Sequence, residues 1–221
     1  MQGSFDAQTD RDESGAGHGP DTGVSAREPQ RRAAGHDDDP AAIARHCRRC
    51  GSPVQHEVPP EDNRIRAVCR SCGTVHYDNP LNVVGTVCFC GPSDERVLLC
   101  RRAIAPRVGY WTLPAGFLEL GETVAQGALR ETSEEAGATV ELMDLLALID
   151  VLPAGQVHLL FRARMLDTHV KPGPETLDAR LFEEHEVPWN DLAFVTVTKA
   201  LRHYFRCRRD GLFPLLVDRV A

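Results

Sequence analysis

From Leu81 onward, apolar residues cluster in short runs that predict β-strands. The runs are rich in β-branched residues and are separated by turn-forming glycine and proline, as in the strands of a sheet. Gly91-Pro92-Ser93-Asp94 separates the first two runs and predicts a hairpin. The expected strands cover residues 82–90, 96–102, 140–151, 157–165 and 179–182.

Two other stretches repeat apolar residues at the spacing of a helix. Residues 123–136 carry apolar side chains at helical spacing and are followed by Gly137, where a glycine commonly ends a helix. Residues 195–209 again place their large apolar side chains on one face. Strands mixed with two helices predict an α+β domain over residues 77–221, and the sequence contains no internal repeat.

Residues 1–44 have a different composition from the rest of the chain. They contain six glycines, three prolines and nine acidic residues against four arginines, a net charge of −5. They have too few large apolar side chains to offset the entropy lost on ordering. We therefore expect a disordered acidic tail, either a solubilising extension or a specific docking arm.

The composition of the whole chain excludes several classes of protein. Of its 221 residues, 42% are hydrophobic and 26% charged, as is typical of globular proteins. No apolar run approaches the ~20 residues of a membrane span, and the acidic N-terminus resembles neither a signal peptide nor a usual transit peptide. The net charge of −7 falls mostly on residues 1–44, which leaves no strong basic patch for nucleic acid or membranes. We expect a soluble, cytoplasmic protein, with a plastid location left open.

Four of the eight cysteines are spaced as the ligands of a structural zinc ion. Cys47 and Cys50 form one C-x-x-C pair, Cys69 and Cys72 form another, and 18 residues separate the pairs. Four thiolates would complete a tetrahedral shell and leave no position for a catalytic water. Disulfides are the alternative, which a reducing compartment disfavours. The spacing predicts a zinc ribbon over residues 45–76.

The predicted ribbon has a modest surplus of arginine. Because it lacks interleaved aromatic residues that could stack on bases, a packing or dimerisation role is favoured over nucleic-acid binding. Three further cysteines, in predicted strands, are expected to be small core residues. The charged residues of the ribbon are Arg45, Arg48, Arg49, Arg64, Arg66 and Arg70 against Glu57, Glu61 and Asp62, and the three core cysteines are Cys88, Cys90 and Cys100.

Three glutamates gather on one face of the helix expected over residues 123–136. Glu131, Glu134 and Glu135 are three and four positions apart, so their side chains are neighbours. Like charges so placed repel unless a cation lies among them, and Mg²⁺ or Mn²⁺ prefer such oxygen ligands. Arg130 can hold one carboxylate in place through a charge-assisted hydrogen bond. On spacing alone, an ordinary solvated acidic face is an equal alternative.

The glutamates belong to a longer pattern that resembles the Nudix box. Gly116 is followed after five residues by Glu122, and after seven more by the run Arg130-Glu131-Thr132-Ser133-Glu134-Glu135-Ala136-Gly137-Ala138. This is similar to the loop–helix–loop signature of hydrolases that cleave nucleoside diphosphates linked to another moiety. Thr132 and Ala138 stand where the family usually has bulkier aliphatic residues. That departure concerns packing of the helix and leaves the carboxylates in place.

The resemblance implies the Nudix fold, a mixed β-sheet sandwiched by helices, and pyrophosphate hydrolysis that depends on Mg²⁺ or Mn²⁺. It implies that Glu131, Glu134 and Glu135 bind the metal and activate water, and that Arg130 orients them. Divalent cations suit this reaction because the negative charge of a pyrophosphate repels an attacking nucleophile.

The resemblance also implies further ligands around the same site. Glu122 would be an additional or outer ligand, and the backbone carbonyl of Ala115 or Gly116 another. Glu175 follows a proline in a segment similar to one that returns to the metal site in related pyrophosphatases. Glu175 is therefore a candidate ligand or base, and a loop-surface carboxylate is the alternative.

A zinc ribbon joined to a Nudix domain is similar to two groups of enzymes. Bacterial NADH and NAD-capped RNA pyrophosphatases have a Ser-Gln-Pro-Trp type motif after the box, where this chain has Pro153-Ala154-Gly155-Gln156. Plant plastid FAD and ADP-ribose pyrophosphatases, with their bacterial relatives, are similar from about Cys47 to Phe205. The resemblance favours hydrolysis of FAD or ADP-ribose to AMP and a second monophosphate. An NADH or NAD-capped RNA hydrolase and a non-catalytic sensor or nucleic-acid regulator are the alternatives.

Three aromatic residues beside the box are candidates for the wall that holds the flat ring of such a substrate. They are Tyr110, Trp111 and Phe117, and ordinary core packing is the alternative for each. Similar enzymes are commonly dimers, so a homodimer is expected as well.

Overall fold

The computed structural model describes residues 44–221, whose strands form two separate sheets. The predicted acidic tail lies outside the described residues except for its last position. Among the described residues, no helix has the length and apolar character needed to cross a membrane.

Residues 45–78 contain a small antiparallel sheet. Its strands are β1 (Gln55–Glu57), β2 (Arg66–Val68) and β3 (Val75–His76), in the order β1-β2-β3. Two tight turns carry the cysteine pairs, and Gly51 and Gly73, which directly follow the second cysteine of each pair, have φ values of 74° and 71°. This left-handed conformation is the reason for glycine at both positions. The predicted four-cysteine ribbon is thus built from two equivalent turns.

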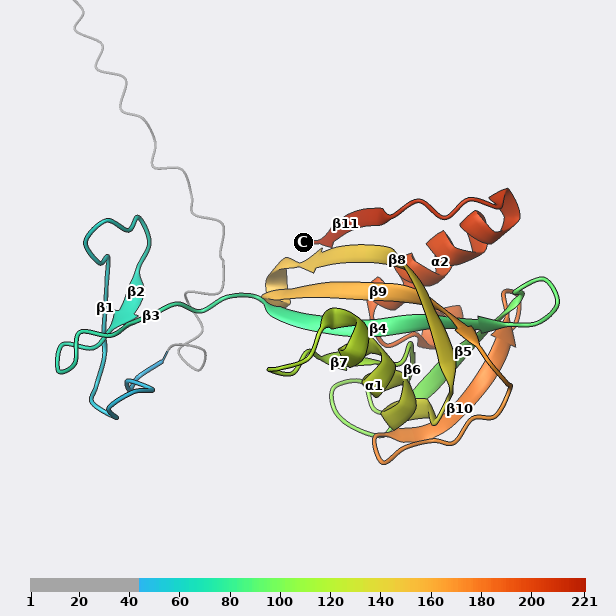
Figure 1. Cartoon of the computed structure of the whole chain (residues 1–221), viewed down its shortest axis with the longest axis horizontal. Helices are drawn as coiled ribbons and strands as arrows, with labels where there is room; N and C mark the ends of the chain where they lie inside the picture. The colour runs from blue at the N-terminus through green and yellow to red at the C-terminus, as the bar shows by residue number, and fades with distance from the viewer. Residues whose placement is uncertain (1–43) are drawn as a thin grey trace, which may run out of the picture. The chain divides into compact units, whose positions relative to one another are not determined.

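The rest of the described chain forms one mixed sheet (Figure 1). The strand order is β10-β5-β4-β9-β8-β11, with β6 paired to β5 and β7 paired to β4. The β4–β9 and β8–β11 pairs are parallel and the others antiparallel. The elements are β4 (Leu81–Cys90), β5 (Arg96–Arg102), β6 (Trp111–Thr112), β7 (Ala115–Phe117), α1 (Val124–Ala136), β8 (Val140–Val151), β9 (Gln156–Met165), β10 (Thr176–Glu183), α2 (Val195–Asp210) and β11 (Leu216–Val220).

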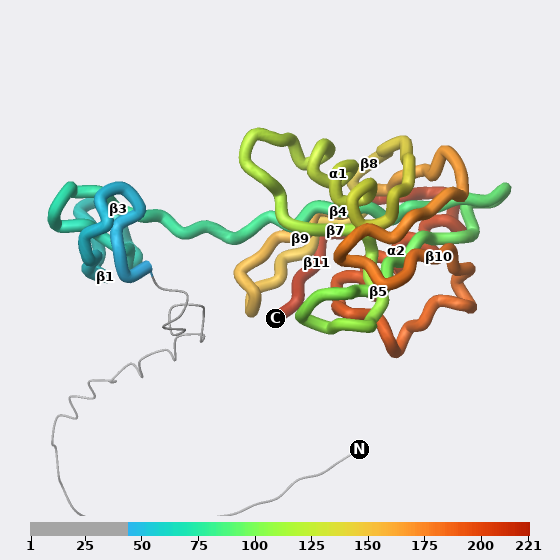
Figure 2. The backbone as a smooth tube through the Cα atoms, turned by 90° about the horizontal axis from the view of Figure 1, so that it is seen from below, coloured from blue at the N-terminus to red at the C-terminus, as the bar shows by residue number. Residues whose placement is uncertain are grey.

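The two helices cover opposite faces of this sheet, as the two views in Figures 1 and 2 show. Successive side chains of a strand point to opposite faces, and β4 follows this rule. Val87 and Phe89 belong to the core cluster that includes Tyr204 of α2. Cys88 and Cys90 belong to a second cluster that includes the last residue of α1. The predicted α+β fold, a mixed sheet between helices, is confirmed.

Helix α1 ends before Gly137 as predicted, and it begins at Val124, one residue after the predicted start. Thr123 is the N-cap: its hydroxyl accepts from the Gln126 N–H, and the Gln126 side chain accepts from the Thr123 N–H, which completes a capping box. At the other end Gly137 adopts a left-handed conformation and its N–H bonds to the carbonyl of Ser133. Thr132, one of the two departures from the box, is fully buried and bonds to Thr86 at 2.7 Å.

Tyr204 provides a test of how this core is held together. Its ring is fully buried, and its hydroxyl donates to the carbonyl oxygen of Asp94 at 2.8 Å. Tyr204→Phe keeps the ring and removes this bond, so we expect the free energy of unfolding to fall by about 1 kcal/mol. Urea denaturation measures the change. Tyr110→Phe, at a partly exposed position, is the control, and equal changes in the two variants would contradict the assignment.

Candidate active site

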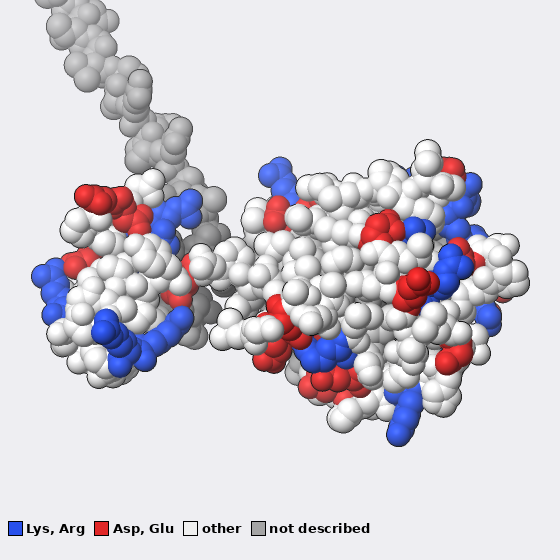
Figure 3. All heavy atoms as spheres, viewed as in Figure 1, with Lys and Arg blue, Asp and Glu red and all other residues white. Residues whose placement is uncertain are grey.

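Arg130 lies at the centre of the acidic face of α1. Its guanidinium donates to both carboxylate oxygens of Glu122, at 2.7 and 3.0 Å, to Glu131 at 2.7 Å and to Glu134 at 3.0 Å. It also donates to the carbonyl oxygen of Phe117 in β7, at 3.1 Å. These hydrogen bonds hold the pKa of Glu122 at about 2. Figure 3 shows acidic side chains gathered around basic ones over this helix.

Glu135 lies deeper than its neighbours, and its carboxylate accepts the backbone N–H of Ala115 at 3.0 Å. Burial raises the pKa of Glu135 to about 7, and the negative charges of Glu131 and Glu175 act in the same direction. Burial likewise raises the pKa of Glu131. Burial and mutual repulsion thus disfavour the charged forms of these two carboxylates, and a bound cation would offset both effects.

Gly116 allows the β7 backbone to approach these carboxylates. A side-chain carbon at this position would overlap the carboxylate of Glu131. Glycine at this position lets the β7 main chain lie against the Glu131 carboxylate without displacing it. Carboxylate and carbonyl oxygens together form a donor set that suits Mg²⁺ or Mn²⁺.

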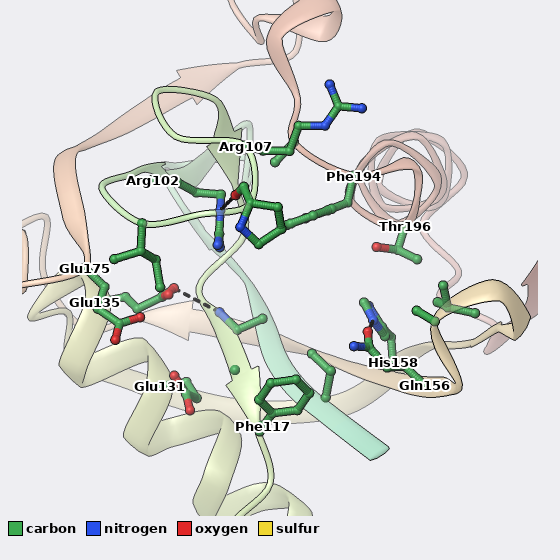
Figure 4. A pocket seen from close by; sticks show the side chains of 18 of the residues that line it. Arg102, Arg107, Phe117, Glu131, Glu135, Gln156, His158, Glu175, Phe194 and Thr196 are labelled. Carbon is green, nitrogen blue, oxygen red and sulfur yellow. Dashed lines mark hydrogen bonds between the residues drawn. The ribbon is translucent and has the colours of Figure 1, made fainter. Parts of the chain in front are cut away.

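A cavity of about 970 Å³ lies against this group, and Figure 4 shows its lining. The structure brings the predicted carboxylates to one end of it. Glu175, from the loop before β10, lies beside the glutamates of α1 although it is 40 positions from Glu135 in sequence. The carboxylates that line the cavity are Glu119, Glu131, Glu134, Glu135 and Glu175.

The three candidate aromatic residues have different surroundings. Phe117 is 53% exposed and lines the cavity. Trp111 packs edge-on against Phe182, with ring centroids 4.9 Å apart, and joins the core beneath α2. The ring of Tyr110 lies under the guanidinium of Arg107. Of the three, the cavity lining includes Phe117 and neither Tyr110 nor Trp111, so Trp111 takes the core-packing alternative.

Several cavity residues were not singled out by sequence reasoning. They come from different elements and have no common spacing that could reveal them. The one available signal was a polar pair, Gln156 and His158, directly before the apolar residues 159–161. The additional lining residues include Arg102, Gln156, His158, Phe194 and Thr196.

The four ribbon cysteines form a second site. Among the described residues they are the one group of possible ligands whose donor atoms all lie within 4.8 Å of one another. The Sγ atoms of Cys47 and Cys72 are 3.6 Å apart and those of Cys50 and Cys69 are 3.5 Å apart. These distances exceed a disulfide bond and approach the edge of about 3.8 Å expected for a ZnS₄ tetrahedron. The residues therefore fit a structural zinc ion.

Ion pairs reduce the positive surplus of the ribbon. Three of its six arginines contact carboxylates of the same small unit. The pairs are Arg48 with Asp78, Arg66 with Asp62 and Arg70 with Glu57. Much of the ribbon's arginine charge is thus neutralised locally, which does not favour a phosphate-binding surface.

Comparison with known families agrees with this two-part geometry. The model of the NUDIX domain matches residues 80–205, more than half of the chain. The chain belongs to the Nudix hydrolase family. A zinc-ribbon model described as Nudix N-terminal matches residues 45–78, the part that carries the four cysteines. The chain is therefore a Nudix pyrophosphatase with an N-terminal zinc-ribbon domain.

Relatives of this Nudix hydrolase differ in their named substrates. A NUDIX hydrolase from Nitrosomonas europaea of known crystal structure is 44% identical, with a TM-score of 0.76, and the match covers 80% of this chain and 99% of that one. An ADP-ribose pyrophosphatase from Methanocaldococcus jannaschii is 32% identical over 51% of this chain and 68% of its own length. A human mitochondrial NAD(P)H pyrophosphatase is 27% identical over 76% of this chain, which spans 44% of that protein.

Proposed function

We propose that this Nudix hydrolase cleaves the pyrophosphate bond of FAD or ADP-ribose and releases AMP and the other half as a monophosphate. Water adds to one phosphorus while the bridging P–O bond breaks, so each product leaves with one phosphate. The observation that carries this proposal is the set of carboxylates, including Glu131, Glu134, Glu135 and Glu175, that line a cavity of about 970 Å³. Cavities of this size accommodate ligands as large as a dinucleotide.

The residues present fit one or more Mg²⁺ or Mn²⁺ ions. Glu131, Glu134 and Glu135 would hold the metal together with a backbone carbonyl of Ala115 or Gly116. When bound, the metal would neutralise the pyrophosphate and lower the pKa of an attacking water. A metal would also offset the energetic cost of desolvating the carboxylates of Glu131 and Glu135.

The other polar residues position this ligand set. Both oxygens of Glu122 accept hydrogen bonds from Arg130, so Glu122 orients Arg130 rather than facing the cavity. Arg130 in turn fixes Glu131 and Glu134. The N–H of Ala115 fixes Glu135, and Glu175 adds a carboxylate from a second segment that can bind metal or accept a proton.

Two observations bear on the substrate. The ADP-ribose pyrophosphatase from Methanocaldococcus jannaschii supports ADP-ribose, and Phe117 offers an exposed aromatic face to a flat ring. Other relatives are named as NAD(P)H pyrophosphatases or NAD-capped RNA hydrolases, which makes NADH and capped RNA the second candidate. The intact carboxylates do not favour a non-catalytic sensor.

A substrate screen tests the proposal directly. Purified full-length protein is assayed with FAD, ADP-ribose, NADH and NAD-capped RNA in Mg²⁺ or Mn²⁺, and AMP is measured by chromatography. We expect kcat/KM for FAD or ADP-ribose to exceed that for NADH by about tenfold or more, a difference of about 1.4 kcal/mol. Higher kcat/KM for NADH or capped RNA would replace the proposed substrate. Absence of hydrolysis with every compound would contradict the proposed function.

A further inference from the structure

Two buried threonines join helix α1 to strand β4. Thr86 of β4 and Thr132 of α1 are both fully buried, and their hydroxyl oxygens are 2.7 Å apart. The Thr132 hydroxyl donates to the carbonyl oxygen of Ala128, one turn earlier in α1, at 2.7 Å. Because a hydroxyl has a single hydrogen, Thr132 accepts from Thr86 and Thr86 donates to it. The link between the strand and the helix therefore has one defined direction.

The thiol of Cys88 completes this chain of hydrogen bonds. Its Sγ atom lies 2.9 Å from the Thr86 hydroxyl oxygen, whose hydrogen is already directed to Thr132. The thiol is therefore the donor. Burial raises the pKa of Cys88, which keeps the thiol protonated and able to donate. Each hydroxyl in the chain thus both donates and accepts, so neither is buried without partners.

The neighbouring contacts between β4 and α1 are apolar. Gly127 of α1 lies so close to Val84 that a side-chain carbon on Gly127 would come within 2.8 Å of the Val84 side chain. Further along the same two elements, Cys88 and Ala136 belong to one buried cluster. Apolar contacts have no preferred direction, whereas a hydrogen bond restricts both distance and angle. The threonine pair therefore fixes where α1 lies along β4.

Thr86 also anchors the peptide unit that contacts Glu135. The Thr86 N–H donates to the carbonyl oxygen of Pro114 at 3.0 Å. The next N–H along the chain, that of Ala115, donates to the Glu135 carboxylate at 3.0 Å, as Figure 4 shows. This carbonyl and this N–H belong to one peptide unit, which is planar. Thr86 therefore holds one end of the plane whose other end binds Glu135.

We propose that Thr86 and Thr132 are positioning residues that place Glu131 and Glu135 for metal binding. Through its backbone, Thr86 orients the peptide unit that holds Glu135, and through its hydroxyl it fixes the helix that carries both glutamates. Thr132 directly follows Glu131 and lies three positions before Glu135, so a shift of α1 at this point moves both carboxylates. The inference rests on the proposed function, because it assumes that these carboxylates bind the metal.

The hydroxyl at position 132 is better explained by geometry than by packing. An aliphatic side chain, which the family usually has there, would fill the space without burying a polar group. The hydroxyl of Thr132 adds a bond of defined length and direction to Thr86. A buried hydrogen-bond network whose members all have partners makes the local structure rigid. Breaking the hydrogen bonds that support metal ligands typically costs about 10- to 100-fold in metal affinity or activity.

Thr132→Val in the full-length protein removes the hydroxyl and keeps the shape of the side chain. We expect kcat to fall about tenfold with KM nearly unchanged. Mn²⁺, titrated without substrate and followed by electron paramagnetic resonance, should bind about tenfold more weakly. Thr132→Ser keeps the hydroxyl and is expected to stay within about twofold of the wild type in both measurements. Tyr204→Phe loses one buried hydroxyl hydrogen bond outside this network, so it controls for stability and should keep both values.

A double variant separates positioning from stability. In Thr86→Val/Thr132→Val neither hydroxyl is left without its partner, so we expect urea denaturation to show that the stability lost in Thr132→Val is largely recovered. The directional link is still missing, so kcat and Mn²⁺ affinity should remain about tenfold below the wild type.

Two results would overturn the positioning role. One is a double variant that regains wild-type kcat and Mn²⁺ affinity together with its stability, and the other is a Thr132→Val variant that equals the wild type in both measurements. If the wild type hydrolyses no nucleotide, the proposed function fails, and the Mn²⁺ titrations still test the positioning. A wild type that also binds no Mn²⁺ overturns both.

Discussion

Replacing Glu134 with glutamine is expected to lower kcat by about 100-fold or more, the loss typical when an essential charged group leaves a catalytic site. Glutamine keeps the shape of the side chain and removes its negative charge. The substitution would weaken a metal ligand and the ion pair with Arg130, which are 3.0 Å apart. The Glu134 side chain is 58% exposed, so the variant is expected to fold normally.

The control for this experiment is Glu141→Gln, which removes the same charge from an exposed position on β8. Hydrolysis of the substrate identified by the screen gives kcat, and titration with Mn²⁺ gives metal affinity. The control is expected to retain kcat within about twofold, the range of a neutral surface change. Unchanged kcat and unchanged Mn²⁺ affinity in Glu134→Gln would show that this carboxylate is not part of the metal site.

Elements with strong local signals could be predicted from the sequence. The helix α1 has a capping box at Thr123 and a left-handed Gly137, both readable from neighbouring residues. The strand over residues 140–151 has the bounds that were predicted. The hairpin turn near Gly91 was also correct, but β4 and β5 pair only close to that turn, and β7 takes the place beside the start of β4.

Elements that depend on distant partners were not predicted. β11 lies close to the end of the chain and pairs in parallel with β8, so that Leu216 lies opposite Ala147. A short strand of this kind gains its stability from a partner remote in sequence, so its own residues do not indicate that a strand will form there. The same holds for β6 and β7, which contain two and three residues.

The active-site residues divide in the same way, into those that local geometry brings together and those that only the fold brings together. The glutamates of α1 are separated by three and four positions, so helix geometry alone brings them together. The cavity lining joins Phe117, His158 and Thr196 from three elements, and only the strand register and the position of α2 bring these residues together. Trp111 shows the converse: it lies beside the box in sequence, yet it packs against Phe182 in the core.

The second large effect is expected in the zinc ribbon. Cys69→Ser should abolish zinc binding and unfold residues 45–78, because a structural zinc ion contributes about 10 kcal/mol or more to the folding of such small units. Cys69 is fully buried, and its carbonyl accepts the N–H of Gly73 in one of the two cysteine turns. The three strands of the ribbon contain only eight residues in total, three in β1, three in β2 and two in β3. A sheet this small cannot replace the metal with a hydrophobic core.

Elemental analysis and NMR separate this prediction from a general loss of stability. The wild type should contain one zinc per chain, and Cys69→Ser none. Amide signals of residues 45–78 should lose dispersion while those of residues 80–221 are retained, because both core clusters consist of residues from the Nudix part. Cys90→Ser, at a buried cysteine outside the ribbon, should keep its zinc. A zinc-free wild type whose mass shows two disulfides would instead establish the alternative that the cysteine spacing left open, since the Sγ atoms would then have closed from 3.5 and 3.6 Å to bonding distance.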